Sequence, residues 1–190
     1  MKALALAAAI ACLALPSYAQ TRVDLSAAMA KDFSAAPSAG QAVRALAADS
    51  PFLGLGWDVV MGHLGLGAVY SVDFNQDAPS AWWVDWEGQG LYLGYHLLEP
   101  RYFIDPFVDA GIGCAGRAFI GPSSTGEQRL ALTIYPFVSA GAALELDGLR
   151  LGAKLSYALA RSAIPATEIP AYPIGRFQVT AFAGISFGGR

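Results

Sequence analysis

The chain has 190 residues, of which 15 are acidic and 12 are basic, so its net charge is −3 at neutral pH. This balance excludes the strongly basic surface that nucleic-acid-binding domains carry. Hydrophobic residues make up 55% of the chain and charged residues only 14%, whereas an ordinary soluble domain is about 25% charged. Yet no apolar run after the first twenty residues approaches the roughly 18 residues of a transmembrane helix. A closed β-barrel is then the remaining way to cross a bilayer, because its strands pair every backbone polar group.

The first 19 residues have the features of a secretory signal peptide. Lys2 precedes an apolar run too short to span a bilayer, and Ser17-x-Ala19 forms a small-residue cleavage site. We therefore expect an exported chain whose signal peptide, residues 1–19, is cleaved. An alternative in which Cys12 carries a lipid fits the preceding residues poorly. Cleavage leaves Cys114 as the one cysteine, which excludes an internal disulfide.

Residues 20–51 are rich in Ala and Ser and are interpreted as an N-terminal extension without strands. Ser38 is a favourable N-cap residue, and a short helix is expected from there to Ala48. We expect a periplasmic extension or a helix against the mouth of a barrel; a plug inside the barrel is the alternative. The predicted barrel domain comprises residues 52–190.

Asp147-Gly148 lies at the centre of two runs in which apolar and polar residues alternate. This dipeptide favours a two-residue type I′ hairpin turn, which places Leu146 opposite Leu149 and Glu145 opposite Arg150. Pro136 interrupts the first of these runs, and we expect a bend or a loss of pairing there.

The same alternation, typical of half-buried strands, continues through the predicted barrel domain. Its phase changes at Gly62-His63, which we interpret as a tight hairpin; a bulge in one long strand is the alternative. Residues 87–90, with two glycines, are interpreted as a loop. Eight antiparallel strands are predicted, at residues 53–61, 64–74, 80–87, 91–98, 107–120, 129–146, 149–160 and 175–187. An even number of strands brings both ends of the barrel domain to the same side.

The two faces of these strands differ in composition. One face is apolar and carries aromatic side chains at Trp57, Tyr70, Trp82, Trp86, Tyr95 and Tyr157. The other face is rich in glycine and carries a balanced set of charges. Small residues suit a crowded barrel interior, whereas a solvent-facing surface would carry many Lys and Glu. The apolar face is therefore predicted to contact lipid, with its aromatic residues near the membrane interfaces.

The polar face is predicted to fill the lumen of the barrel with a structural network of charges. Acidic residues lie mainly in the first half of the chain and basic residues in the second, so closure of the barrel brings opposite charges together. An eight-stranded barrel is just wide enough for side chains to fill it. A narrow conducting pathway is the alternative. The predicted lumen residues are Asp58, Asp73, Asp85, His96, Asp109, Arg117, Arg129, Glu145, Arg150, Lys154 and Arg176.

The signal peptide, the two-residue repeat and the final strand RFQVTAFAGISF resemble the small eight-stranded outer-membrane proteins of Gram-negative bacteria, the OmpA/OmpX-like barrels in the broad sense. The resemblance covers about residues 52–190 and is architectural. It implies an all-β, closed, antiparallel up-and-down transmembrane barrel in the outer membrane, with a structural or undefined surface role. The implied partners are outer-membrane lipid and the assembly machinery that binds the C-terminal strand. One departure is that Gly188-Gly189-Arg190 follow Phe187, where the family usually ends on the aromatic residue.

No catalytic, cofactor-binding or metal-binding residues are predicted. Neither His63 nor His96 lies near a serine or a carboxylate at a recognisable catalytic or ligand spacing. Gly111-x-Gly113-x-x-Gly116 matches a dinucleotide fingerprint by letters only, because it lies inside a predicted strand with no helix after it. Two other functions remain open: a soluble periplasmic barrel that binds an apolar ligand, and an outer-membrane lipid-modifying enzyme.

Overall fold

The computed structural model describes residues 21–48, 52–78, 81–98, 102–120, 130–159, 162–163 and 172–188. Its strands are β1 (Thr21–Phe33), β2 (Phe52–Met61), β3 (Leu64–Ala78), β4 (Ala81–His96), β5 (Ile104–Ile120), β6 (Leu130–Leu146), β7 (Leu149–Ala158), β8 (Ser162–Ala163) and β9 (Phe177–Gly188). The helix α2 (Ala39–Ala48) follows β1. The predicted signal peptide lies outside the described residues.

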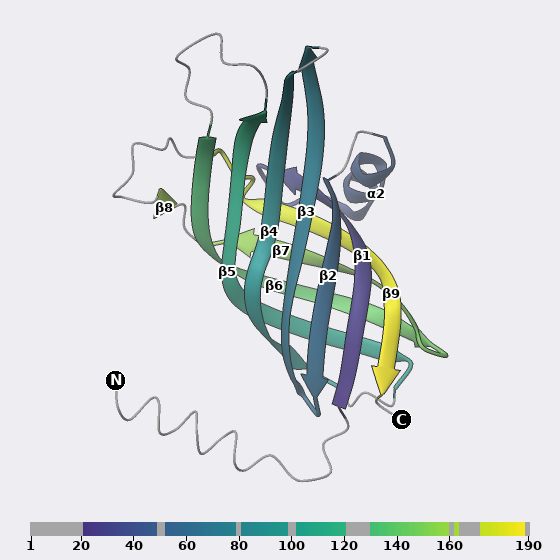
Figure 1. Cartoon of the computed structure of the whole chain (residues 1–190). Coiled ribbons are helices and arrows are strands. Elements are labelled where there is room, and N and C mark those ends of the chain that lie inside the picture. The colour runs from purple at the N-terminus through teal and green to yellow at the C-terminus, as the bar shows by residue number, and fades with distance from the viewer. Residues whose placement is uncertain are drawn as a thin grey trace, which may run out of the picture.

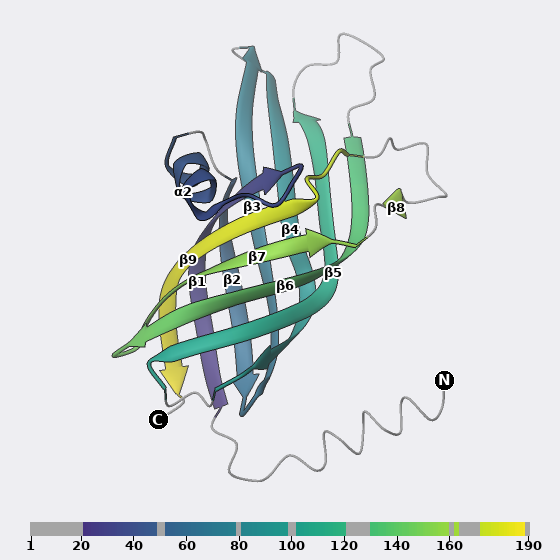
Figure 2. The same cartoon turned by 180° about the vertical axis from the view of Figure 1, so that it is seen from behind.

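Eight of the strands close into a barrel (Figures 1 and 2). Each strand from β1 to β6 pairs antiparallel with the next, β7 pairs with β9, and β9 pairs with β1 to complete the ring. The two-residue β8 pairs only with β6 within the described part of the chain. The predicted closed antiparallel up-and-down barrel of eight strands is confirmed.

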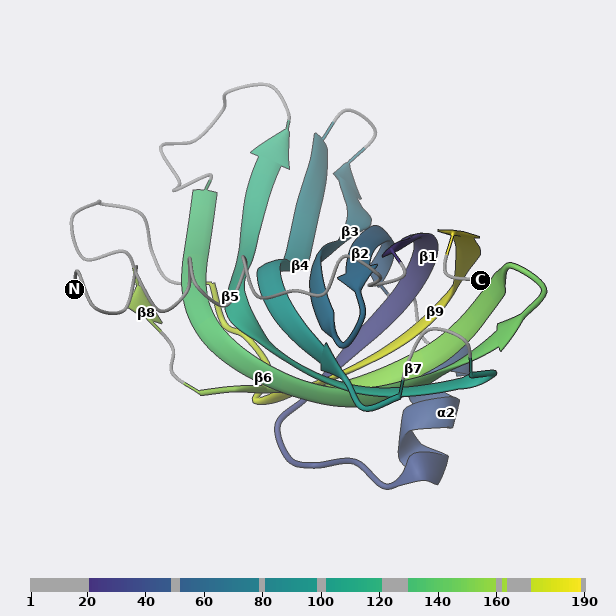
Figure 3. The same ribbon diagram turned by 90° about the horizontal axis from the view of Figure 1, so that it is seen from below.

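The two ends of the barrel differ (Figure 1). At one end β1 begins opposite the end of β9, with Arg22 beside Gly188, and the tight turns 62–63 and 147–148 lie at this same end. We call it the turn end. At the opposite end, the loop end, lie the longer connections from β1 to β2, from β5 to β6 and from β7 to β9, and the two-residue connection from β3 to β4. The turn end also holds the seven-residue connection from β4 to β5. At the loop end, α2 lies outside the wall beside β1 (Figures 1 and 3).

Strand β1 corrects the predicted N-terminal extension. Residues 21–33 form a full strand of the barrel wall, with ten residues in register with β2 and twelve with β9. Its side chains do alternate: Arg22 and Asp24 are buried inside the barrel, whereas Val23 and Leu25 are exposed outside. The small apolar Ala residues that follow weaken the contrast between the two faces, and the alternation was therefore missed.

The expected short helix is confirmed as α2. Ser38 caps it reciprocally with Gln41: the Gln41 backbone N–H donates to Ser38 Oγ (3.4 Å), and the Ser38 N–H donates to Gln41 Oε1 (2.9 Å). Because the helix lies outside the wall at the loop end, it does not plug the lumen.

Strand β4 corrects a second boundary, because residues 81–96 form one strand instead of two with a loop at 87–90. The register against β5 shifts between Gly88 and Leu91, and β3 pairs with β4 on both sides of the same place. A β-bulge changes the phase of the alternation as a hairpin does. One strand, β1, was missed, and another, β4, was divided in two. The predicted number of eight strands is therefore right, although the boundaries at β1 and β4 are wrong.

Both predicted tight hairpins are confirmed. Met61 pairs with Leu64 around Gly62-His63, and Glu145 pairs with Arg150 around Asp147-Gly148. Asp147 has φ +50° and Gly148 has φ +86°, so both turn residues are left-handed, as a type I′ turn requires.

Pairing is also lost beside Pro136 as expected, but only on one side. The β7 ladder ends at Phe137 and Ala158, and the Leu159 N–H then donates to the Pro136 carbonyl (2.9 Å). On the β5 side the ladder runs on, with Pro136 opposite Ile112.

Apolar side chains lie on the outer face of the wall and polar side chains on the inner face, as predicted. Large apolar side chains point outward on the strands all round the barrel, for example Leu55 (74% exposed), Leu93 (69%) and Ile112 (60%). The interior holds most of the buried charged and polar side chains together with an apolar cluster around Tyr92, Tyr135 and Phe137.

Candidate functional site

The interior at the turn end contains a cluster of five charged residues, which we call the turn-end cluster: Arg22, Asp24, Asp105, Glu145 and Arg150. Arg22 Nη2 and Arg150 Nη1 both donate to Asp105 Oδ2 at 2.7 Å. Arg22 Nε also donates to Asp24 Oδ2, and Arg150 Nη1 to Glu145 Oε1, each at 2.9 Å. The side chains of both arginines are 2–3% exposed. Strands β1, β5, β6 and β7 are thereby cross-linked through the lumen by ion pairs.

His96 extends this cluster through Asp105. Its Nδ1 lies 2.7 Å from Asp105 Oδ1, and its ring packs against Phe107. A Cβ on Gly65 would lie 2.8 Å from His96 Nε2, so the absence of a side chain at this position makes room for the ring. A His–Asp pair is therefore present, although none was predicted. No hydrogen bond joins His96 to a hydroxyl group in the described part of the chain.

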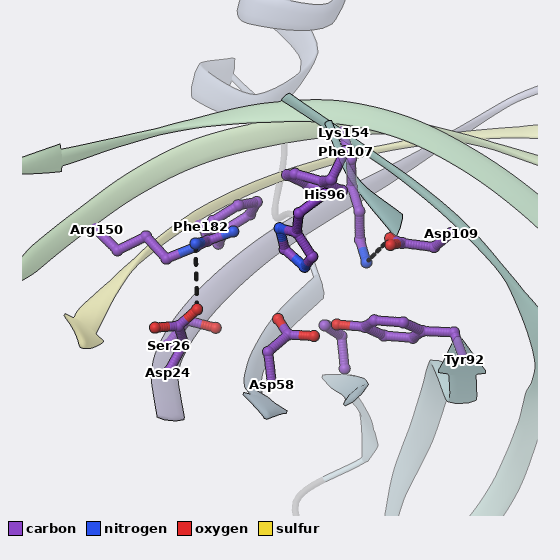
Figure 4. A pocket seen from close by; sticks show the side chains of 11 residues that line it. Asp24, Ser26, Asp58, Tyr92, His96, Phe107, Asp109, Arg150, Lys154 and Phe182 are labelled. Atoms are coloured by element: carbon purple, nitrogen blue, oxygen red, sulfur yellow. Dashed lines mark hydrogen bonds and ion pairs between the residues drawn. The ribbon is translucent and has the colours of Figure 1, made fainter. Parts of the chain in front are cut away.

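A cavity lies next to the turn-end cluster and is lined by Asp24 and Arg150 of that cluster together with Asp58, Tyr92 and Lys154 (Figure 4). Lys154 Nζ approaches Asp109 Oδ2 (3.4 Å) and lies 4.2 Å from the centre of the Tyr92 ring. The Asp58 carboxyl group and the Tyr92 hydroxyl point toward each other (Figure 4). The space suffices for about one water molecule.

An aromatic layer separates this region from the loop end. Tyr92 and Phe137 pack edge to face, with ring centroids 6.4 Å apart. Ile174, which is 4% exposed, packs into the same apolar cluster. It belongs to residues 172–176, which we call the cap segment. This segment is held by the Thr133 hydroxyl, which donates to the Tyr172 carbonyl (2.7 Å), and by Asp32 Oδ2, which accepts from the Gly175 N–H (3.1 Å).

A second small cavity, the loop-end cavity, is lined by Glu87, Gln89, Ser156 and Gln178 as well as by the cap segment. Gln89 Nε2 donates to Ser156 Oγ and to Gln178 Oε1 (3.3 Å). The Tyr135 hydroxyl donates to Glu87 Oε1 (3.2 Å). This polar group therefore connects β4, β6, β7 and β9.

One ion pair lies nearer the solvent at the loop end. Arg117 donates to both oxygens of Asp85, with Nη2 2.6 Å from Oδ2, and its guanidinium lies over the rings of Trp83 and Tyr172. The side chain of Arg117 is 45% exposed. Burial beside Asp85 raises the pKa of the Tyr172 hydroxyl to about 12, so this tyrosine is neutral at physiological pH.

The structure brings most of the predicted lumen residues together. Those that are buried or partly buried inside the barrel are Asp58, Asp85, His96, Asp109, Glu145, Arg150 and Lys154. Arg117 reaches Asp85 from an exposed position, Asp73 is half-buried on β3, and Arg176 is exposed in the cap segment. Arg129 lies outside the described residues.

Several central residues were missed by the sequence reasoning. Arg22 and Asp24 were missed with β1, although their alternation with Val23 and Leu25 is a detectable signal. Asp105 was missed because it was assigned to the connection before β5. Gln89 was missed because residues 87–90 were interpreted as a loop.

The described residues offer little for metal or covalent chemistry. They contain no group of three or more His, Cys, Asp and Glu side chains that could hold a metal ion. Cys114 is half-buried and unpaired. The His96–Asp105 pair is held by two arginines and has no nucleophile beside it among the described side chains. These geometries match a packed ionic interior.

The chain matches solved structures, but it matches no family model and no curated protein sequence. No helix in the described ranges is long and apolar enough to cross a membrane. Among solved structures, the chain is similar to the N-terminal β-barrel domain of Pseudomonas aeruginosa OprF, with 14% identity and a TM-score of 0.52 over 89% of this chain and 99% of that one. The chain has the fold of the small eight-stranded outer-membrane β-barrels.

Two further structures are similar at lower scores. Ail, the attachment invasion locus protein of Yersinia pestis, in complex with the heparin analogue sucrose octasulfate, has 10% identity and a TM-score of 0.49, over 89% of this chain and 97% of that one. Neisserial surface protein A has 13% identity and a TM-score of 0.44, over 88% and 94%. At these identities the similarity concerns the fold alone.

Proposed function

We propose that this chain is an outer-membrane β-barrel protein with a closed, ion-paired interior, and that its role is structural or lies at the cell surface. The observation that carries the proposal is the sorting of side chains across the wall. Large apolar residues are exposed outside on the strands, while the buried charges meet inside. A soluble protein rarely exposes contiguous apolar surface beyond a few hundred Å², whereas lipid makes such a surface favourable.

The unlike ends of the barrel suggest its orientation. Barrels of this architecture have short periplasmic turns and longer extracellular connections. We therefore assign the turn end to the periplasm and the loop end, with α2 and the cap segment, to the cell surface. The expected periplasmic position of residues 20–51 is replaced in this proposal, because α2 lies at the loop end. Strand β9, with Phe187 exposed outside near its end, is the segment we propose for recognition by the assembly machinery.

The interior argues against the two other functions considered. A binding site for an apolar ligand is a sizeable cavity with few polar groups, but these two cavities are small, and buried charged or polar side chains stand beside the apolar ones in their lining. Lipid-modifying chemistry requires a nucleophile next to a base. The one His–Asp pair of the described residues is buried in the lumen, away from lipid.

Cell fractionation tests the proposal directly. The protein is expected in the outer-membrane fraction, and unboiled samples are expected to migrate differently from boiled ones on a denaturing gel. Recovery in the osmotic-shock fluid without detergent would contradict the proposal. In planar bilayers the purified protein is expected to give no steady conductance, because side chains fill the interior.

A further inference from the structure

Two carboxyl groups meet inside the barrel at the loop end, one from β1 and one from β4. The Glu87 carboxyl group forms a hydrogen bond with that of Asp32, and Glu87 is only 3% exposed. An ionised carboxylate can accept hydrogen bonds but cannot donate one. The contact therefore requires one proton between the two groups, since like charges this close cannot both ionise.

The other hydrogen bonds of the pair indicate which group carries the proton. Asp32 Oδ2 accepts from the Gly175 N–H (3.1 Å), and Asp32 Oδ1 accepts from Gln178 Nε2 (3.3 Å). Glu87 Oε1 accepts from the Tyr135 hydroxyl (3.2 Å), whereas Glu87 Oε2 has no donor in the described part of the chain. Native proteins rarely leave a buried polar atom unpaired. A proton on Glu87 Oε2 that is donated to Asp32 satisfies this atom and leaves Asp32 as the ionised acceptor.

The groups around the pair fit a single negative charge. On the neighbouring strands, Asp85 is bound by Arg117, and Tyr135 contributes a hydroxyl donor. In the cap segment, Tyr172 is neutral, and the exposed Arg176 lines the loop-end cavity. Arg176 thus offers one positive charge near the pair. Two bare carboxylates would exceed it, and uncompensated buried charge is strongly destabilising.

Asp32 also holds the cap segment. A Cβ on Gly175 would lie 2.7 Å from Asp32 Cβ, so the absence of a side chain lets the backbone of the segment approach β1 closely. Beside this contact, Ile174 packs into the apolar cluster of the interior. Because Asp32 contacts both Glu87 and Gly175, a change in the charge of the pair acts directly on the cap segment.

We propose that Glu87 and Asp32 share one proton and that this proton holds the cap segment closed over the loop end of the barrel. Loss of the proton places two negative charges in contact. Asp32 is half-buried whereas Glu87 is buried, so Asp32 is the group that turns towards solvent and releases Gly175. The segment is therefore closed at acidic and neutral pH and is released as the pH rises. The aromatic layer and the turn-end cluster stay in place, so release uncovers the loop-end cavity without opening a channel.

Thiol labelling in detergent micelles tests this inference, independently of where the protein resides in the cell. In a Cys114→Ser background, Ile174→Cys places a thiol in the cap segment at a position that is 4% exposed. Val43→Cys on α2, at a position that is 67% exposed, is the reference that reports how the reagent itself responds to pH. Release of the segment costs one proton, so the labelling rate of Ile174→Cys relative to Val43→Cys is expected to rise by up to about tenfold per pH unit.

Glu87→Gln separates the shared proton from other effects of pH. Its amide N–H can donate to Asp32 and does not titrate, so the relative labelling rate is expected to stay low at every pH. Glu145→Gln, which changes a carboxylate of the turn-end cluster, is the matched control and should keep the rise. A relative rate that does not change with pH when Glu87 is present, or an equal rise in Glu87→Gln, would overturn the inference.

Infrared spectroscopy covers the case in which Glu87→Gln does not fold. The unchanged protein is expected to show the C=O band of a protonated carboxyl group at neutral pH. The band should disappear over the same pH range in which the relative labelling rate rises. Absence of the band at neutral pH, or its loss at a pH where the labelling rate stays constant, would contradict the proposed role of the proton.

Discussion

At the scale of single residues, burial separates two ion pairs that look alike in the sequence. Arg150 is almost fully buried and contacts Asp24, Asp105 and Glu145, whereas Arg117 is 45% exposed and contacts Asp85 alone among the carboxylates of the described residues. We expect Arg150→Leu to lower the free energy of unfolding by about 3–5 kcal/mol, because it leaves buried carboxylates uncompensated. Urea titration of the barrel refolded in lipid vesicles measures this change.

The control is Arg44→Ala on α2, an exposed position that should alter the free energy of unfolding by no more than about 0.5 kcal/mol. If Arg150→Leu changed the free energy of unfolding as little as this control does, the turn-end cluster would not be needed for the stability of the barrel.

Arg117→Ala is expected to lower the free energy of unfolding by about 1 kcal/mol or less, because an exposed ion pair is screened by solvent. The same urea titration checks it. A loss as large as that of Arg150→Leu would mean that the ion pair at the loop end is closed to solvent.

The sequence indicates which of these charges face inward but not how deeply each is buried. Glu145 and Arg150 could be paired from the Asp147-Gly148 register alone. The hydrogen bonds from Arg22 and Arg150 to Asp105 could not be predicted in this way, because they depend on how the closed barrel curves β5 towards β1.

At the scale of the element, a tight turn and a β-bulge both shift the alternation of apolar and polar residues along the chain. The residues around the shift decide which of the two structures forms. Asp147-Gly148 has strong turn chemistry and forms a turn. Glycine is present at 88 and 90 for a reason other than a turn: a Cβ at Gly88 would lie 2.4 Å from the ring of Tyr70. These residues are small because a ring crosses the strand there. That contact is invisible in the sequence, which is why β4 was divided.

The positive φ of Gly148 leads to a test of the β6–β7 hairpin. Gly148→Ala is expected to lower the free energy of unfolding by about 1–2 kcal/mol, because an L-residue is strained in the left-handed region. Gly40→Ala is the matched control, since nothing lies within 4 Å of the added Cβ in α2, and it should be neutral or slightly stabilising. Equal effects of the two substitutions in urea unfolding would count against the type I′ turn.

At the scale of the whole molecule, β1 closes the ring. Without residues 21–33, β2 and β9 would each have an unpaired edge, which is not tolerated in lipid. We expect a variant that lacks these residues to lose heat-modifiable migration. Replacement of α2 by a Gly/Ser segment of equal length should preserve that migration, because the helix lies outside the wall. If the variant without residues 21–33 still folded into a barrel, the barrel domain would begin at residue 52, as predicted from the sequence.

The central claim is that the apolar exterior faces lipid, and a fluorophore on the wall tests it most directly. In a Cys114→Ser background, Leu93→Cys carries an environment-sensitive label at an outward position that is 69% exposed. With the barrel refolded in vesicles, we expect blue-shifted emission that is quenched by a lipid-attached quencher and not by iodide in the buffer. Quenching by iodide, with no effect of the lipid-attached quencher, would show that this wall faces water and would contradict the account.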